Sequence, residues 1–403
     1  MTIDYRPDDP QTLADPFPIY QRLRDEDPAY GSPRLKAWVL TRYDDIRRSC
    51  LNRGLSSDRL RPFFAAMPGG EAEKIADIVR YLSLWMVFRE PPEHTRLRRV
   101  ASRVFNATSM RAMSDRIAGI AEWLLDEIGE RSEFDFISAF AGPLPGLVIL
   151  DMLGVPRADL PRLKRLSDDM ALFIGSARTM PERYAAAQTA THAMAEFFQS
   201  MLAMRRAQPT GDLISELAHL RDGGEALSED ELVATCILLL FAGHETTTNH
   251  IGNAMLALMR FPGEMQRLRA DSQLAEAAVE ELLRYDGPSG AQVRVVQVEH
   301  ERHGKILNAG DRVFMFLNAA NRDPRVYAEP DRLDLLRDGP PHLAFGHGIH
   351  ICLGFPPARL EGRISLPALL RRYRTIELGS DRLQWLDSMV FRGLQALPVK
   401  VTR

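Results

Sequence analysis

One cysteine of the chain lies among glycines and large apolar residues, a setting that could present its sulfur to a flat ligand. The stretch runs from Phe345 to Gly354 and reads F-G-H-G-I-H-I-C-L-G. Most free cysteines are small core residues without chemistry. Cys352, however, is bracketed by Gly346, Gly348 and Gly354, and glycine allows positive φ or the close approach of a flat ligand. The cysteine also precedes a predicted helix, whose N-terminal N–H groups would favour a thiolate over a thiol. The pattern therefore indicates an anionic sulfur in a dry pocket.

This stretch resembles the haem-binding loop of the cytochrome P450 family, F-G-x-G-x-H-x-C-x-G, at every fixed position. The resemblance implies that Cys352 is the axial ligand to the iron of haem b (iron protoporphyrin IX). A thiolate ligand favours cleavage of the O–O bond of dioxygen. Phe345, Gly346 and Gly354 would then shape the cofactor site, and His350 would bind a propionate. A zinc site built from His350 and Cys352 is disfavoured, because no second pair of ligands completes a tetrahedron.

A long helix is predicted upstream of the cysteine loop. Ser228 stands three residues before Glu231, the spacing of a capping box, and an apolar run follows. We expect a helix over about residues 229–259. Its middle reads A-G-H-E-T-T-T, where a glycine and β-branched threonines lower helix stability. Local rules broken inside an element indicate a functional site.

The same run resembles the oxygen-activation segment of the family, A-G-x-[D/E]-T-T. The resemblance implies that Gly243, beside Ala242, leaves room for dioxygen. It also implies that Thr246 donates a hydrogen bond during oxygen activation and that Glu245 relays protons from solvent. His244 occupies a variable position and is expected to point outward or to be packed.

Two basic side chains, His94 and Arg98, are predicted to share one face of a helix that starts after Pro91 and Pro92. Such a face is either solvated or a site for an anion. The match to the family's H-x-x-x-R segment favours binding of the haem propionates. Arg294 matches a strand arginine with the same role.

The E-x-x-R motif of Glu281 and Arg284 carries little weight alone, since ion pairs at this spacing are common on helix surfaces. Its place between the two motifs above resembles the family's structural network. Arg332 is expected to supply the second arginine of that network. Substrate contacts are expected from segments that border the pocket in the family, although apolar residues at helical spacing are more often core. These candidates are Leu84, Trp85, Val87, Phe173, Leu239, Val293, Met389 and Val390.

The resemblance implies a mainly α (α+β) cytochrome P450 fold, with haem between the long helix and the cysteine loop. We expect one domain over residues 1–403, β-rich at about 30–60, 293–317 and 374–403. Periodicity predicts strands at 37–41, 293–296 and 312–317, with a closing strand resembling the family's at 393–399. A short helix is expected within residues 9–28 and a packed loop over 56–88. Residues 113–206 are expected to be mostly helical.

Composition excludes several classes of protein. The formal net charge is -3 with 26% charged residues, so no basic excess points to nucleic acid. The first residues show neither a signal sequence nor a membrane span, which predicts a soluble, cytoplasmic protein without a membrane anchor. The three cysteines are widely spaced and odd in number, as expected in a reducing compartment.

The resemblance implies a monooxygenase that inserts one oxygen atom of dioxygen into a moderately hydrophobic small molecule. The chain has neither a G-x-G-x-x-G unit nor a cysteine cluster. We therefore expect a monomer without a fused reductase, which takes electrons from an external ferredoxin and ferredoxin reductase. A basic patch is the expected docking surface, unless its arginines are merely solvated. Its candidates are Arg96, Arg99, Arg103, Arg359 and Arg363. A peroxide-driven enzyme and a non-enzymatic haem sensor are the alternatives.

Overall fold

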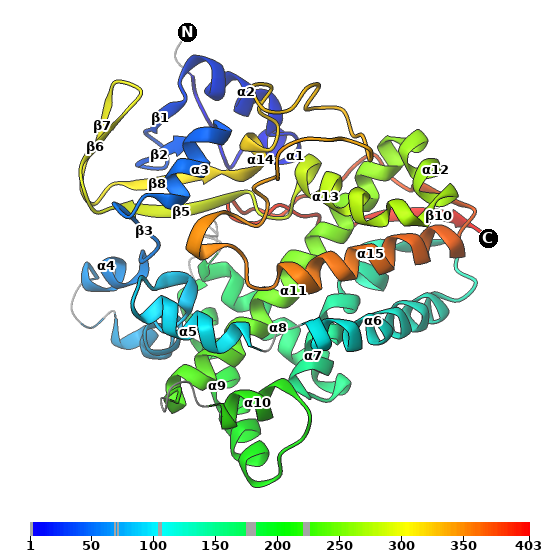
Figure 1. Cartoon of the computed structure of the whole chain (residues 1–403), viewed down its shortest axis with the longest axis horizontal. Helices are drawn as coiled ribbons and strands as arrows, with labels where there is room; N and C mark the ends of the chain where they lie inside the picture. The colour runs from blue at the N-terminus through cyan, green and yellow to red at the C-terminus, as the bar shows by residue number, and fades with distance from the viewer. Residues whose placement is uncertain (1–2, 68–69, 71, 104–106, 175–182, 221–225) are drawn as a thin grey trace. The chain divides into compact units, whose positions relative to one another are not determined.

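The computed structural model of the chain describes residues 3–67, 70, 72–103, 107–174, 183–220 and 226–403 (Figure 1). These residues form two compact units. Unit 1 comprises Met1–Ser56, Ser114–Leu144 and Thr246–Arg403, and unit 2 comprises Ser57–Met113 and Pro145–Glu245. All strands that the structure describes belong to unit 1, whereas the described part of unit 2 contains only helices, turns and loops.

The larger sheet of unit 1 has five strands in the order β1-β2-β8-β5-β3, antiparallel except for the pair β2–β8. Both faces are buried. Along β8, Val313 and Met315 enter one core cluster, and Phe314 and Phe316 enter another, as the two-residue period of a strand requires. The strands are β1 Ala29–Ser32, β2 Ala37–Leu40, β3 Leu55–Ser56, β5 Ala291–Val296 and β8 Arg312–Phe316. The three strands predicted from periodicity are confirmed by β2, β5 and β8.

Two smaller sheets complete the strands of unit 1. One has the order β4-β10-β9, with β4 Glu133–Asp135, β9 Thr375–Leu378 and β10 Pro398–Thr402. The other is a hairpin of β6 His300–Arg302 and β7 Lys305–Leu307, which projects from the end of β5 in Figure 1. The closing strand predicted at 393–399 starts later, at Pro398. Residues before it form only an isolated bridge between Trp385 and Leu394.

Unit 1 also contains the helices that connect these strands. The single helix expected within residues 9–28 is two helices, because Asp15 has extended backbone angles between them. Helix α15 starts at Phe355 and carries proline in its first turn, where a missing N–H is tolerated. The helices of unit 1 are α1 Pro10–Ala14, α2 Phe17–Glu26, α3 Tyr43–Leu51, most of α6 Ala107–Ile128, α12 Pro262–Ala270, α13 Ala275–Asp286, α14 Leu317–Ala320 and α15 Phe355–Arg372.

Unit 2 is helical where the structure describes it. The region 56–88, expected as a loop, contains α4 Leu60–Ala65 and three short helical turns. The other helices are α5 Glu93–Ser102, most of α7 Pro143–Leu153, α8 Leu160–Ile174, α9 Arg183–Ala207 and α10 Leu213–His219. The mainly helical fold class with a smaller sheet region is confirmed. Among the described residues, no helix combines the length and apolar content that crossing a bilayer requires.

The long helix α11 extends from Glu229 to Arg260 and belongs in part to each unit. Its predicted capping box is present. Ser228 N–H donates to Glu231 Oε2 at 2.9 Å, and Glu231 N–H donates back to Ser228 Oγ at 3.3 Å. The helix continues without a break through its glycine and threonines. The unfavourable propensities of these residues are therefore outweighed by the burial of most of the helix.

A buried histidine of α11 should make the protein sensitive to acid. His250 is 2% exposed, and neither ring nitrogen has a hydrogen-bond partner. Burial, reinforced by His342 and opposed by Glu280, lowers the pKa of His250 from 6.5 to about 4. The unfolded state therefore binds the proton first as pH falls. As the pH falls from about 6.5 to about 4, the free energy of unfolding should therefore decrease by up to about 3 kcal/mol.

This loss is tested by following the melting temperature of the wild type and of His250→Gln from pH 7 down to about pH 4.5, within the window in which His250 titrates. The variant, which has no imidazole to protonate, should lose less of its melting temperature than the wild type. Equal losses in the two proteins would show that His250 does not titrate in this window.

Candidate active site

The cysteine loop is closed by its own backbone. Cys352 N–H donates to Phe345 O at 2.9 Å. Gly346 and Gly348 have φ values of +73° and +75°, which other residues rarely adopt. Gly354 differs, since its φ is −83° and it is the N-cap of α15. The thiol of Cys352 is exposed and lies just before this helix N-terminus.

Strand β5 and helix α3 support the loop from within unit 1. A Cβ on Gly348 would lie 2.9 Å from the backbone oxygen of Cys50, and a Cβ on Gly346 would meet the side-chain amide of Gln292. A larger residue at Gly348 would displace the loop, and at Gly346 the positive φ already strains any other residue. No motif identified Cys50 or Gln292 as support residues, because backbone packing leaves no signal in residue type.

Arg294 of β5 is buried, with 7% of its surface exposed, and its charge acts on Cys50 beside the cysteine loop. Burial raises the pKa of the Cys50 thiol, while Arg294 and a backbone hydrogen bond from His347 oppose that rise. Arg294 therefore lies near Cys50, which itself contacts the cysteine loop. His350, the other propionate candidate of unit 1, is half-buried on that loop.

Helix α11 presents one accessible face in a segment that is otherwise buried. Ala242 is exposed, and Gly243, Glu245 and Thr246 are partly exposed, whereas Phe241, His244 and the residues from Thr247 to Leu258 are buried. Positions i, i+3 and i+4 lie on the same side of a helix. The predicted oxygen-activation residues therefore share one accessible stripe.

Two neighbours on α11 face the interior of unit 2. A Cβ on Gly243 would lie 3.3 Å from the side chain of Ile149, so this glycine makes room for helix α7. His244 is 3% exposed and lies against Gly146, which agrees with the expectation of a packed histidine.

The basic residues predicted near the start of α5 lie on the expected helix. His94 is buried and Arg98 partly buried, four residues apart on one face of α5. Arg96 of the same helix forms an ion pair with Glu231 of α11.

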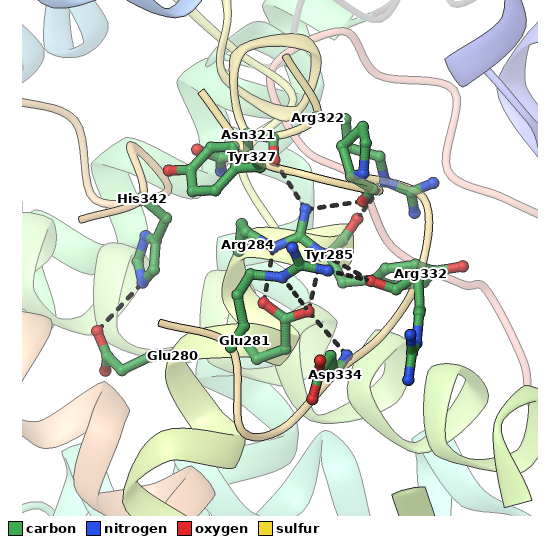
Figure 2. Close-up of polar contacts among 12 residues, drawn as sticks. Glu280, Glu281, Arg284, Tyr285, Asn321, Arg322, Tyr327, Arg332, Asp334 and His342 are labelled. Carbon is green, nitrogen blue, oxygen red and sulfur yellow. Dashed lines mark hydrogen bonds and ion pairs between the residues drawn. The ribbon is translucent and has the colours of Figure 1, made fainter. Parts of the chain in front are cut away.

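The E-x-x-R pair forms a buried network, shown in Figure 2. Arg284 donates to both carboxylate oxygens of Glu281, at 2.6 and 2.8 Å. The side chains of Glu281 and Arg284 are only 4% and 3% exposed. Arg284 also donates to three backbone carbonyls, those of Asn321, Pro330 and Arg332.

The prediction that the side chain of Arg332 completes this network is wrong. Its guanidinium is 58% exposed and contacts Glu329, and only its carbonyl oxygen accepts from Arg284. Arg337 is the second arginine, with its Nε 3.1 Å from Glu281 Oε1 and its side chain 12% exposed. Residue type could not separate the two arginines, because the turn that brings Arg337 back to α13 is set by backbone hydrogen bonds.

The candidate substrate residues fall into two groups. Trp85 is 2% exposed and packs against Phe88 and Phe241, and Val293 belongs to a core cluster of unit 1. Both are explained as core residues. In unit 2, Leu84 and Phe173 are partly exposed, Val87 is exposed and Leu239 is buried, and in unit 1 Met389 and Val390 are partly exposed.

No cluster of three or more metal-binding side chains of His, Cys, Asp or Glu occurs in the described part of the chain.

Comparisons with known proteins identify the family of this fold. The model of the family described as cytochrome P450 matches residues 157–392. The chain is 38% identical to cytochrome P450 107B1 of Saccharopolyspora erythraea over 91% of this chain and 89% of that protein. It is 33% identical to the polyketide biosynthesis cytochrome P450 PksS of Bacillus subtilis over 96% of each. The crystal structure of P450BioI with a fatty-acyl carrier protein matches with a TM-score of 0.89 at 32% identity, covering 97% of this chain and 99% of that one.

The corrected network yields a stability prediction. Arg337→Met should lower the free energy of unfolding by about 3 kcal/mol, because it leaves part of a buried carboxylate uncompensated. Arg332→Met, the matched control five residues away, should change it by less than about 0.5 kcal/mol, as expected for an exposed ion pair. Thermal unfolding of the two variants measures the difference. Equal destabilisation would return Arg332 to the network.

Proposed function

The chain belongs to the cytochrome P450 family, and from that premise we propose that it hydroxylates a moderately hydrophobic small molecule in a biosynthetic pathway. Its relatives are named cytochrome P450 enzymes, monooxygenases and hydroxylases, and the chain is a monooxygenase of this family. Haem is the cofactor that the family carries. The observation that carries the proposal is the exposed thiol of Cys352 on a glycine loop at the start of α15.

The residues present fit haem. Cys352 offers an accessible sulfur, the donor that the family places on iron. Arg294 is a buried cation in the same unit, and His350 is a second donor on the loop itself. These two, with His94 and Arg98 of α5, are proposed to bind the propionates.

Haem iron with a thiolate ligand supplies the cleavage of dioxygen that gives the product its oxygen atom. The chain's own residues are proposed to control the protons. Glu245, on the accessible stripe of α11, takes protons from solvent at its carboxylate. Thr246 holds a proton at Oγ1 and donates it toward the reacting oxygen. Ala242, one turn earlier on the same stripe, keeps that surface free of bulk.

The substrate is proposed to be apolar over most of its surface. In unit 2, Phe173 contacts Phe63, Phe64 and Tyr184 at ring-centroid distances of 5.8–6.4 Å. This aromatic cluster, with Leu84 and Val87, suits an apolar ligand. One relative is named for polyketide biosynthesis, and another was crystallised with an acyl chain on its carrier protein. Both names support a biosynthetic substrate.

Electrons are proposed to come from a ferredoxin and its reductase, since enzymes of this family use external donors. The docking surface is proposed to include Arg99 and Arg103, the basic residues at the C-terminal end of α5. The proposal includes a monomer in the cytoplasm, and the wide spacing and odd number of the three cysteines support a reducing compartment.

The proposal is tested by the absorption spectrum of the reduced carbon-monoxide complex. The wild type should show the band of thiolate-ligated haem, and Cys352→Ser should lose it. Cys236→Ala, which alters a buried cysteine of α11, is the control and should keep the band. A Cys352→Ser protein with an unchanged spectrum would exclude Cys352 as the ligand.

The proton role of Thr246 gives a second prediction. Thr246→Ala should form product at least about tenfold more slowly while still consuming oxygen, because a donor has been removed from the reacting oxygen. Thr246→Ser keeps the hydroxyl and should recover most of the rate. Product and oxygen are measured in the same reaction. An unchanged yield of product per oxygen in Thr246→Ala would contradict the proton role of Thr246.

A further inference from the structure

The ring of Phe345 lies among charged groups from outside its loop. The guanidinium carbon of Arg359 is 4.8 Å from the centroid of the Phe345 ring and 5.0 Å from that of the Phe355 ring. The imidazole of His342 packs against Phe345, with ring centroids 5.7 Å apart. A cation over an aromatic face is attracted to it, and these contacts restrict the orientation of the ring. We call Glu280, His342, Phe345, Phe355 and Arg359 the Phe345 cluster.

Glu280 of α13 joins the charged members of this cluster. Arg359 donates to both of its carboxylate oxygens, from Nε at 2.5 Å and from Nη2 at 2.7 Å. His342 Nε2 lies 3.3 Å from the second oxygen, a contact drawn in Figure 2. Burial raises the pKa of Glu280, but the contacts with His342 and Arg359 outweigh it and lower the pKa to about 2. The carboxylate is therefore ionised at physiological pH.

The contact with His342 has a defined polarity. Ala344 N–H donates to His342 Nδ1 at 3.1 Å, so that nitrogen is an acceptor and Nε2 carries the hydrogen. Nε2 lies 3.3 Å from Glu280 Oε2, but the contact does not have the geometry of a hydrogen bond. His342 links the carboxylate of α13 to the backbone directly before Phe345.

The cluster reaches the sulfur through one hydrogen bond. Phe345 O accepts the N–H of Cys352, so the backbone of Phe345 fixes the residue that carries the thiol. The same residue is restricted at its ring by Arg359 and His342. A displacement of Glu280 would be transmitted through Phe345 to Cys352.

We infer that Glu280 is a positioning residue for the thiolate, acting through Arg359, His342 and Phe345 to fix the sulfur and thereby the ease of haem reduction. The inference rests on the proposed function, because it takes Cys352 as the ligand to iron. It also assigns Arg359 an internal role, since its guanidinium is held by Glu280 and two rings rather than presented to a redox partner.

The chain contains a matched control for this role. Glu276 lies one turn before Glu280 on α13 and pairs with Arg363, one turn after Arg359 on α15. Glu276 is 72% exposed. Among the described residues, Arg363 packs over no aromatic ring. Glu276→Gln removes the same charge from the same helix pair without touching the Phe345 cluster.

The first experiment measures the midpoint potential of the substrate-free holoprotein. Glu280→Gln should change the equilibrium constant for reduction at least threefold, or about 28 mV at 59 mV per tenfold, because Arg359 and His342 lose the carboxylate that holds them against Phe345. Glu276→Gln should change this constant less than half as much. Equal shifts in the two variants would overturn the inference and leave only a distant charge effect.

The second experiment separates position from charge. Arg359→Lys keeps the cation but loses the bidentate pairing and the planar contact with the rings. In the reduced carbon-monoxide complex, Arg359→Lys and Glu280→Gln should lose the thiolate band at least threefold faster in urea than wild type and Glu276→Gln. An Arg359→Lys protein as durable as wild type would contradict the positioning role.

Failure of this inference and failure of the proposed function give different results. If the proposed function fails, the wild type itself lacks the thiolate band. If only the inference fails, the wild type shows the band, Cys352→Ser abolishes it, and Glu280→Gln behaves as Glu276→Gln.

Discussion

The cysteine loop can hold its sulfur in a fixed place because the chain leading into it is attached to helix α13 by a buried carboxylate. Glu281 accepts hydrogen bonds from Arg284, Arg337 and the backbone N–H of Asp334. Arg284 in turn binds the carbonyls of the turns between Asn321 and Arg332. Backbone groups without regular partners are thus satisfied in a segment that contains neither helix nor strand. These hydrogen bonds hold the segment in one conformation and thereby fix the position at which the cysteine loop begins.

A buried ion network contributes specificity more reliably than net stability, because desolvation offsets much of the attraction between the charges. In this protein, two neighbouring residues of α13 hold two different segments. Glu281 fixes the chain before the loop, and Glu280 contacts the loop through Arg359 and His342. The helix thereby determines both the approach to the loop and the packing of its first aromatic ring.

Much of this architecture could be predicted from the sequence where residue type determines local structure. The capping box at Ser228 predicted the start of α11, and alternation predicted strands β2, β5 and β8. The positive φ values of Gly346 and Gly348 could be predicted for the same reason, whereas Gly354 has a negative φ.

The errors occur where tertiary contacts decide. Arg332 and Arg337 are chemically identical, and only the path of the chain selects Arg337. The contact of Gly243 with Ile149 of α7 could not be foreseen either, because glycine carries no side chain that indicates a neighbour. Glu280 has no motif of its own beside the E-x-x-R pair. Its role depends on Arg359 and His342, which lie far along the chain.

The central claim is that the sulfur of Cys352 binds the haem iron in the resting protein. X-ray absorption at the iron edge of the ferric holoprotein tests it directly, because scattering from sulfur differs from that of nitrogen and oxygen. We expect one sulfur in the first coordination shell of the wild type and none in Cys352→Ser. A first shell of nitrogen and oxygen alone in the wild type would contradict the claim.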